Sequence, residues 1–175
     1  MFKYVALIVV LFIGAVLTLA SLKPDTFQIE RSMKMKAMPE TIFPLINDLH
    51  RWQAWSPWAN KDPAMKNPYS GANSGVGAIY EWSGNRDVGQ GRMEITDMSP
   101  LSRIELKLDL IEPFATQNIV ELRLEFDGDF TETTWLMHGP MPFVSKIFSV
   151  FSSMDSLVGK DFEADLANLK ALAEK

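Results

Sequence analysis

Side chains suited to acid–base or metal chemistry are few in this sequence, and they are scattered. The chain contains two histidines, His50 and His138, and no cysteine. Disulfides, thiol catalysis and cysteine-based zinc sites are therefore excluded, and no set of His, Asp and Glu has the spacing of zinc ligands. His50 ends a predicted helix, where capping the last carbonyls is a common role, and His138 ends a predicted strand at the surface. We predict no metal site and no cofactor.

Charged residues that could form a catalytic pair lie on predicted strands. Glu81, Arg92 and Arg103 alternate with apolar neighbours, which places them on the face opposite the aromatic and methionine side chains. We expect that face to be solvated, and we name no catalytic residue. A cavity-facing Glu81 or Arg103 would instead support an enzyme of the cyclase or dehydratase type. A further acidic set, predicted to form a solvated helix face, comprises Asp155, Asp161, Glu163 and Asp165.

Aromatic and methionine residues form the more informative pattern. Three of the five tryptophans lie within Ile46–Trp58, where a predicted helix gives way to a loop containing Pro57. Such a cluster either fills a core or forms the lip of an apolar cavity, and flexible methionines beside rigid rings suit an adaptable pocket. Phe114 is predicted as the tip of a lid. The predicted ligand cavity comprises Trp52, Trp55, Tyr80, Trp82, Met93, Ile95, Leu106, Leu108, Phe114, Trp135, Met137, Phe148, Phe151 and Met154.

Two other interpretations of these apolar residues stay open. Each residue taken singly is explained more simply by packing in a solid core. Alternatively, the Trp52–Trp58 loop docks on a protein partner or a membrane surface, and the tryptophans would then be exposed. The sequence identifies no protein partner, and a formal net charge of −5 without any basic block argues against nucleic acid.

Residues 1–22 form an apolar segment that we interpret as a membrane anchor. Residues 4–22 carry no charge, and nineteen helical residues span roughly 28 Å, close to the bilayer core. A cleaved signal peptide is the alternative, since Thr18 and Ala20 form a passable cleavage site, although the apolar run is long for one. A third interpretation is that the segment is a buried helix of a soluble protein.

The charges on either side of this anchor give opposite predictions for its orientation in the membrane. The short tail that carries Lys3 favours an extracytoplasmic domain, which we expect. Four basic residues after the segment favour a cytoplasmic domain under the positive-inside rule: Lys23, Arg31, Lys34 and Lys36. Cleavage would instead give a secreted or periplasmic protein.

Residues 23–26 are predicted as a linker, and residues 27–175 as one domain. Its strands are expected at 27–36, 67–70, 78–82, 89–97, 103–110, 118–126 and 131–138, because apolar and polar residues alternate there. A helix begins at Pro39, and apolar residues recur at three- and four-residue steps from Phe143 to Lys175, which predicts one long helix. Gly159 is its weak point. The expected class is α+β: an antiparallel sheet covered by the C-terminal helix.

The order of several short motifs resembles the START-like (SRPBCC) superfamily, specifically its polyketide cyclase/dehydrase and lipid transport group. The resembling segments are Met38-Pro39-Glu40, Trp52-x-x-Trp55-Ser56-Pro57-Trp58, Asp62-Pro63, Gly75-Val76-Gly77, Tyr80-Glu81-Trp82, Gly89-x-Gly91-x-Met93, Thr133-Thr134-Trp135, Met154-Asp155 and Asp161-Phe162-Glu163 through Leu169. The resemblance extends from about Phe27 to Ala173.

This resemblance implies a helix-grip fold, in which a curved antiparallel sheet wraps around a long C-terminal helix and leaves an apolar cavity. Members bind lipids, sterols, polyketides, quinones or hormones, and some catalyse cyclisation, so the fold alone does not select a function. The leading hypothesis is membrane-tethered binding of a hydrophobic small molecule such as a lipid, an isoprenoid or a polyketide-like compound. The alternatives are a cyclase or dehydratase acting on such a molecule, and a protein-interaction module.

Overall fold

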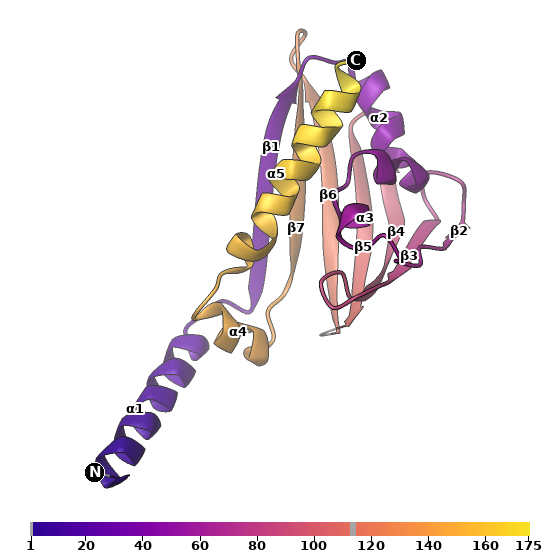
Figure 1. The fold of residues 1–175 in the computed structure, drawn as a ribbon. Helices are drawn as coiled ribbons and strands as arrows, with labels where there is room; N and C mark the ends of the chain where they lie inside the picture. Colours follow the sequence, from indigo (N-terminus) through magenta and orange to yellow (C-terminus); the bar gives the residue numbers. More distant parts are fainter. Residues whose placement is uncertain (1, 113–114) are drawn as a thin grey trace.

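The protein is one curved antiparallel sheet wrapped around a C-terminal helix, with an apolar helix projecting from one end (Figure 1). The computed structural model describes residues 2–112 and 115–175. In chain order its elements are α1 (Phe2–Ser21), β1 (Thr26–Met35), α2 (Pro39–Asn47), the 3-10 helix η1 (Leu49–Ala54), α3 (Trp58–Lys61), β2 (Tyr69–Gly71), β3 (Ala78–Ser83), β4 (Gln90–Ser99), β5 (Arg103–Glu112), β6 (Thr116–Phe126), β7 (Thr131–Pro140), α4 (Phe143–Ser149) and α5 (Met154–Ala173). The α+β helix-grip prediction is confirmed.

The sheet has the order β1-β7-β6-β5-β4-β3-β2, and every neighbouring pair is antiparallel. Period-two alternation places one apolar row on its concave face. Leu106 on β5 pairs with Val120 on β6, which pairs with Met137 on β7, and all three side chains are buried. The strand ends lie within two residues of the predicted ones.

Helix α5 covers only part of this concave face, and that shortfall creates room for a cavity. It packs mainly against β1 and buries Phe162, Leu166 and Leu169. Seven strands at about 4.8 Å make a sheet roughly 30 Å across, whereas a helix with its side chains is about 10 Å wide. The remaining width, over β6 to β3, is covered by α2, η1, α3 and their connecting loops (Figure 1).

Arg31 interrupts the apolar alternation of β1 because it pairs with α5 across the concave face. Its guanidinium lies 2.8 Å from Asp155 Oδ1 and 2.8 Å from Glu163 Oε1. A Cβ atom on Gly159 would lie within 3.0 Å of the guanidinium, so this glycine lets the arginine cross the helix. Asp155 and Glu163 remain more than half exposed, so they lie on the solvated acidic face that the sequence predicts while also pairing with Arg31.

The expected single helix from Phe143 to Lys175 is two helices, α4 and α5. The break falls before Gly159, where the Ser153 side chain accepts a hydrogen bond from Ser156 N at 3.1 Å and caps α5. Apolar periodicity continues across residues 150–153 and so does not reveal the capping geometry. As a consequence α4 turns away from the sheet and packs beside α1.

Helix α1 is long and apolar enough over Lys3–Ser21 to cross a membrane, and little of it is buried. It projects from the end of the sheet where β1 begins (Figure 1). Helix composition of this kind also occurs in signal sequences.

Candidate ligand cavity

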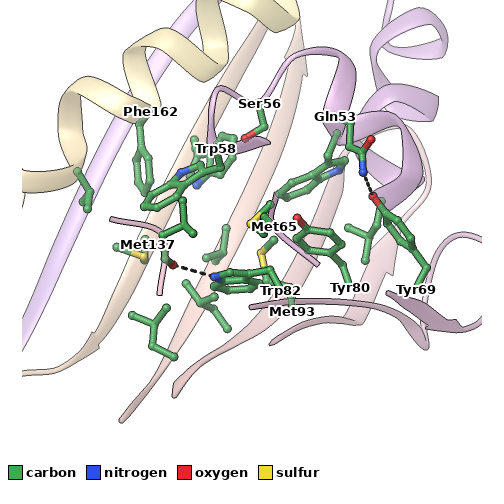
Figure 2. Close-up of a pocket in the computed structure, with 18 residues that line it drawn as sticks. Gln53, Ser56, Trp58, Met65, Tyr69, Tyr80, Trp82, Met93, Met137 and Phe162 are labelled. Carbon is green, nitrogen blue, oxygen red and sulfur yellow. Dashed lines mark hydrogen bonds between the residues drawn. The ribbon is translucent and has the colours of Figure 1, made fainter. Parts of the chain in front are cut away.

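An apolar cavity of about 170 Å³ lies between the concave sheet face, η1, α3 and α5 (Figure 2). Its wall comprises Leu49, Trp52, Gln53, Ser56, Trp58, Met65, Tyr69, Tyr80, Trp82, Val88, Met93, Leu108, Leu110, Val120, Trp135, Met137, Val158 and Phe162. None of these side chains is an Asp, Glu, His, Lys or Arg. The wall is therefore suited to binding an apolar molecule rather than a charged one.

Two tryptophans at and behind one side of the cavity are fixed by backbone carbonyls. Asp48 starts η1 by accepting a hydrogen bond from His50 N at 3.0 Å. Trp52 Nε1 donates to the Ile46 carbonyl at 2.8 Å, and Trp55 Nε1 donates to the Leu45 carbonyl at 3.1 Å. These bonds satisfy both indoles inside a low-dielectric region, so Trp52 forms a rigid part of the wall and Trp55 packs behind it in the core.

The sheet side of the wall comes from β3, β4 and β5. Tyr80 and Trp82 stack with ring centroids 5.9 Å apart, and Trp82 Nε1 donates to the Val88 carbonyl at 2.9 Å. Trp82 pairs with Gly91 across β3 and β4, next to a register shift. A Cβ atom on Gly91 would lie within 3.0 Å of Cζ2 and Cη2 of the indole. The glycine thus lets the Trp82 ring lie against the sheet.

Two polar groups in the wall can serve a guest. Burial raises the pKa of Tyr80 to about 12, with a smaller contribution from Tyr69 and an opposing hydrogen bond with Asn67, so its hydroxyl stays protonated at neutral pH and keeps capacity for one further hydrogen bond. Trp135 Nε1 is buried and has no hydrogen-bond partner among the described residues. By contrast, Gln53 Nε2 already donates to the Tyr69 hydroxyl at 2.9 Å. An unpaired buried donor is costly, and an acceptor oxygen on a guest would relieve it.

Asp165 is a buried acid on α5 behind the cavity wall. It is fully buried, and neither carboxylate oxygen has a hydrogen-bond partner in the described part of the chain. Burial raises its pKa to about 7; nearby Asp161 adds to the rise, while Ser56 and Lys61 oppose it. Ser56 lines the cavity, so this carboxyl lies one side chain away from it.

Helix α3 contributes Trp58 to the cavity wall and is joined to α5 by an ion pair. Lys61 Nζ forms an ion pair with Asp161 Oδ2 at 2.7 Å and lies 4.1 Å from the centroid of the Trp58 ring. These contacts join α3 to α5 and hold the Trp58 ring, which lines the cavity, in place. The acidic face of α5 is therefore divided among ion pairs and one buried carboxyl, contrary to the solvated face expected for Asp161 and Asp165.

The charged candidates from the sequence lie away from the cavity. Arg92 pairs with Glu94 at 2.8 Å, and Arg103 pairs with Asp97, Glu105 and Glu121. The side chain of Glu81 is exposed. These residues belong to the solvated convex face, as their alternation predicts.

The histidines also lie outside the cavity wall. His50 stacks on Tyr69 with centroids 4.1 Å apart, and its Nδ1 lies 3.0 Å from Asp48 Oδ1. The expectation that its side chain caps helix carbonyls is wrong, since Asp48 begins a second helical turn there. His138 is exposed on β7. No group of three or more His, Asp or Glu among the described residues is placed to hold a metal ion.

The residues predicted for the cavity fall into four groups. Those that line it are Trp52, Tyr80, Trp82, Met93, Leu108, Trp135 and Met137. Those packed in or against the core are Trp55, Ile95, Leu106 and Met154. Phe148 and Phe151 are exposed, because α4 leaves the sheet. Phe114, the predicted lid tip, lies outside the described residues.

Several wall residues were not predicted. Leu110, Val120, Val158 and Phe162 occupy the same apolar rows as predicted residues, so the alternation and the helix period could have found them. Leu49, Gln53, Ser56, Trp58, Met65 and Val88 come from short helices and loops, and Tyr69 comes from the three-residue strand β2; these segments are too short to show a clear period. The burial of Trp52 and Trp55 also removes the exposed tryptophans that a docking loop requires.

Comparison with known proteins connects this architecture to one family. The family model described as "Polyketide cyclase / dehydrase and lipid transport" matches residues 26–174. No curated protein matches significantly.

Among solved structures, the di-domain ARO/CYC protein StfQ of the steffimycin biosynthetic pathway has a TM-score of 0.63 at 9% identity, covering 85% of this chain and 51% of that one. Aha1 from Colwellia psychrerythraea has a TM-score of 0.60 at 16% identity, covering 85% and 96%. Major latex-like protein 151 from Panax ginseng has a TM-score of 0.60 at 12% identity, covering 87% and 100%. At these identities the structures share the fold alone.

Proposed function

Because this chain belongs to the polyketide cyclase/dehydrase and lipid transport family, we propose that it binds a compact apolar molecule in its cavity while its N-terminal helix tethers it to a membrane. The cavity is the observation that carries the first part of this proposal. Protein interiors pack at crystal-like density, so a void of about 170 Å³ walled by aromatic rings and methionines is unusual for a merely structural core.

The size and polarity of the cavity restrict the guest. A volume of about 170 Å³ resembles the roughly 150 Å³ that admits benzene and is below the roughly 300–1,000 Å³ of a drug-sized pocket. A single ring or a short isoprenoid unit fits without rearrangement, whereas a longer guest requires Met65, Met93 or Met137 to move. The Trp135 N–H and the Tyr80 hydroxyl favour a guest with one carbonyl or hydroxyl oxygen.

Ligand binding is tested by comparing dye binding to the unaltered protein with dye binding to a variant in which a larger side chain fills the cavity. The full chain in mild detergent should bind a polarity-sensitive naphthalene dye with a blue-shifted emission and take energy from the wall tryptophans. Leu108→Phe adds volume inside the cavity and should weaken dye binding at least tenfold. Ile111→Phe adds the same volume at an exposed position of the same strand and should bind like the unaltered protein. Equal affinity of the two variants would place the dye elsewhere and reject the cavity as the site.

The tether is supported by the length and exposure of α1, and we propose that it is retained with the domain extracytoplasmic. The absence of cysteine makes single-cysteine labelling direct. Val76→Cys, at an exposed position, should react with a membrane-impermeant maleimide on intact cells. Reaction only after permeabilisation would reverse the orientation, and recovery of the domain in the soluble fraction without residues 1–20 would show cleavage.

An enzyme of the cyclase or dehydratase type is the second candidate, and Asp165 favours it. A carboxyl with a pKa near 7 is suited to proton transfer, provided that Ser56 moves aside. The guests recovered from unaltered protein and from Asp165→Asn protein should be identical if the chain only binds. A difference equal to one water molecule in mass would establish dehydration and replace the binding proposal.

A further inference from the structure

Helix α4 presents its apolar side to solvent and its polar side to the protein. Phe143, Val144 and Phe148 of α4 and Phe151 of the following turn are between 49% and 67% exposed. At 100° per residue these four side chains fall within about 140° of one another. We call them the α4 patch. On the other side, Lys146 and Ser149 are buried. A helix at the surface of a soluble domain has the reverse arrangement.

The polar side of α4 is held by the segment that joins α1 to the sheet. Lys146 Nζ forms an ion pair with Asp25 Oδ1 at 2.6 Å, and Met141 N donates to the Asp25 carbonyl at 2.7 Å. The Ser149 hydroxyl donates to the Lys146 carbonyl at 2.8 Å. Because these polar contacts fix the orientation of α4, they also determine that its phenylalanine side chains face outward.

The position of the α4 patch identifies what covers it. Helix α4 packs against α1 and lies beside the end from which α1 leaves the domain (Figure 1). If α1 spans the bilayer, as proposed above, its last turn lies at the membrane surface, and α4 must lie there too. Aromatic and aliphatic side chains on one face of a helix are typical of interfacial insertion. We propose that the α4 patch is embedded in the lipid headgroup–acyl boundary.

This docking also directs the cavity toward the bilayer. The pairings Thr26 with Pro140, Leu110 with Thr116 and Gln90 with Glu112 gather these strand ends at one end of the sheet. The cavity wall reaches that end through Leu110, Val88 and Val158. A docked α4 therefore holds the domain with this end facing lipid, so the guest enters from the membrane rather than from water.

Depth-dependent fluorescence on the full chain tests the docking. Single-cysteine variants Val144→Cys and Phe148→Cys carry an environment-sensitive dye, and the protein is reconstituted in phosphatidylcholine vesicles with or without nitroxide-labelled lipid. Val76→Cys, similarly exposed but between β2 and β3, is the matched control, and Leu11→Cys reports on α1. All four positions are exposed, so labelling should not disturb folding.

Labels at positions 144 and 148 should shift to the blue and be quenched by the nitroxide lipid at least threefold more than the label at position 76. Quenching at position 11 together with a water-like signal at 148 would overturn the docking while leaving the tether intact. A water-like signal at position 11 would overturn both. A blue shift at 148 without nitroxide quenching would assign the patch to a protein contact, such as a second copy, and likewise reject the proposal.

Discussion

Replacing Asp165 by asparagine should stabilise the protein by an amount that grows with pH. In the fold this carboxyl is fully buried with no well-formed hydrogen bond among the described residues, and burial raises its pKa from 3.8 to about 7 against the opposing effect of the nearby Ser56 hydroxyl. The folded state therefore holds its proton more tightly than the unfolded state. Below about pH 4 the carboxyl is neutral in both states and does not lower the free energy of unfolding. Between about pH 4 and pH 7 the unfolded state loses its proton first, so the free energy of unfolding falls progressively.

The magnitude follows from the two pKa values. Each pKa unit corresponds to about 1.4 kcal/mol, so the cost of Asp165 above pH 7 reaches about 4 kcal/mol. Asparagine has the same shape and no proton to lose. The advantage of Asp165→Asn in the free energy of unfolding should therefore be about 2–3 kcal/mol larger at pH 8 than at pH 5. For a domain of this size that difference corresponds to roughly 5–10 °C in Tm.

Thermal unfolding of the full chain in detergent, followed by circular dichroism at pH 5, 6, 7 and 8, measures this difference. Asp129→Asn, at an exposed turn, controls for the general loss of one negative charge. The asparagine variant should show the divergence between pH 5 and 7 and a plateau above it. A difference in Tm that stays constant from pH 5 to 8 would refute the burial of an unpaired carboxyl.

Three further changes test the wall of the cavity. Gly91→Ala brings a methyl group within 3.0 Å of the Trp82 ring and should cost about 1–3 kcal/mol in unfolding experiments while weakening dye binding; unchanged values would mean that the ring position is not set by this glycine. Trp55→Ala empties a core site that is 1% exposed and should cost about 3–5 kcal/mol, whereas Trp58→Ala should cost less than half as much yet change dye affinity more. The reverse order would make α3, rather than the tryptophan cluster, the structural element. The tyrosinate absorbance that disappears in Tyr80→Phe should titrate near pH 12, and a midpoint near 10 would show that the hydroxyl is open to water.

The sheet could be predicted because its sequence follows one physical rule. On β5, Ile104, Leu106 and Leu108 alternate with charged residues, and that alternation fixes both the strand and its inward face. The inward face was correctly predicted, but which inward residues line a void depends on where α5 lies. Ile95 and Leu106 pack in the core, whereas Met93 and Leu108 border the cavity.

The misplaced residues share one cause, which is that tertiary contacts act across distant segments. Phe148 and Phe151 follow the helical period of α5, but the cap at Ser153 and the ion pair from Lys146 to Asp25 redirect α4 toward α1. Similarly, Arg31 interrupts the apolar alternation of β1, and only the tertiary structure, which places Asp155 and Glu163 opposite it, explains the charged residue at this position. Neither pairing has a local sequence signal.

Native mass spectrometry of the full chain, released from a membrane extract in mild detergent, tests the binding proposal most directly. We expect a retained, non-covalent adduct of one apolar molecule carrying a carbonyl or hydroxyl oxygen, and we expect Leu108→Phe protein from the same membranes to lack it. Recovery of only the empty chain from the unaltered protein, or equal occupancy in the filled variant, would contradict a guest in the cavity.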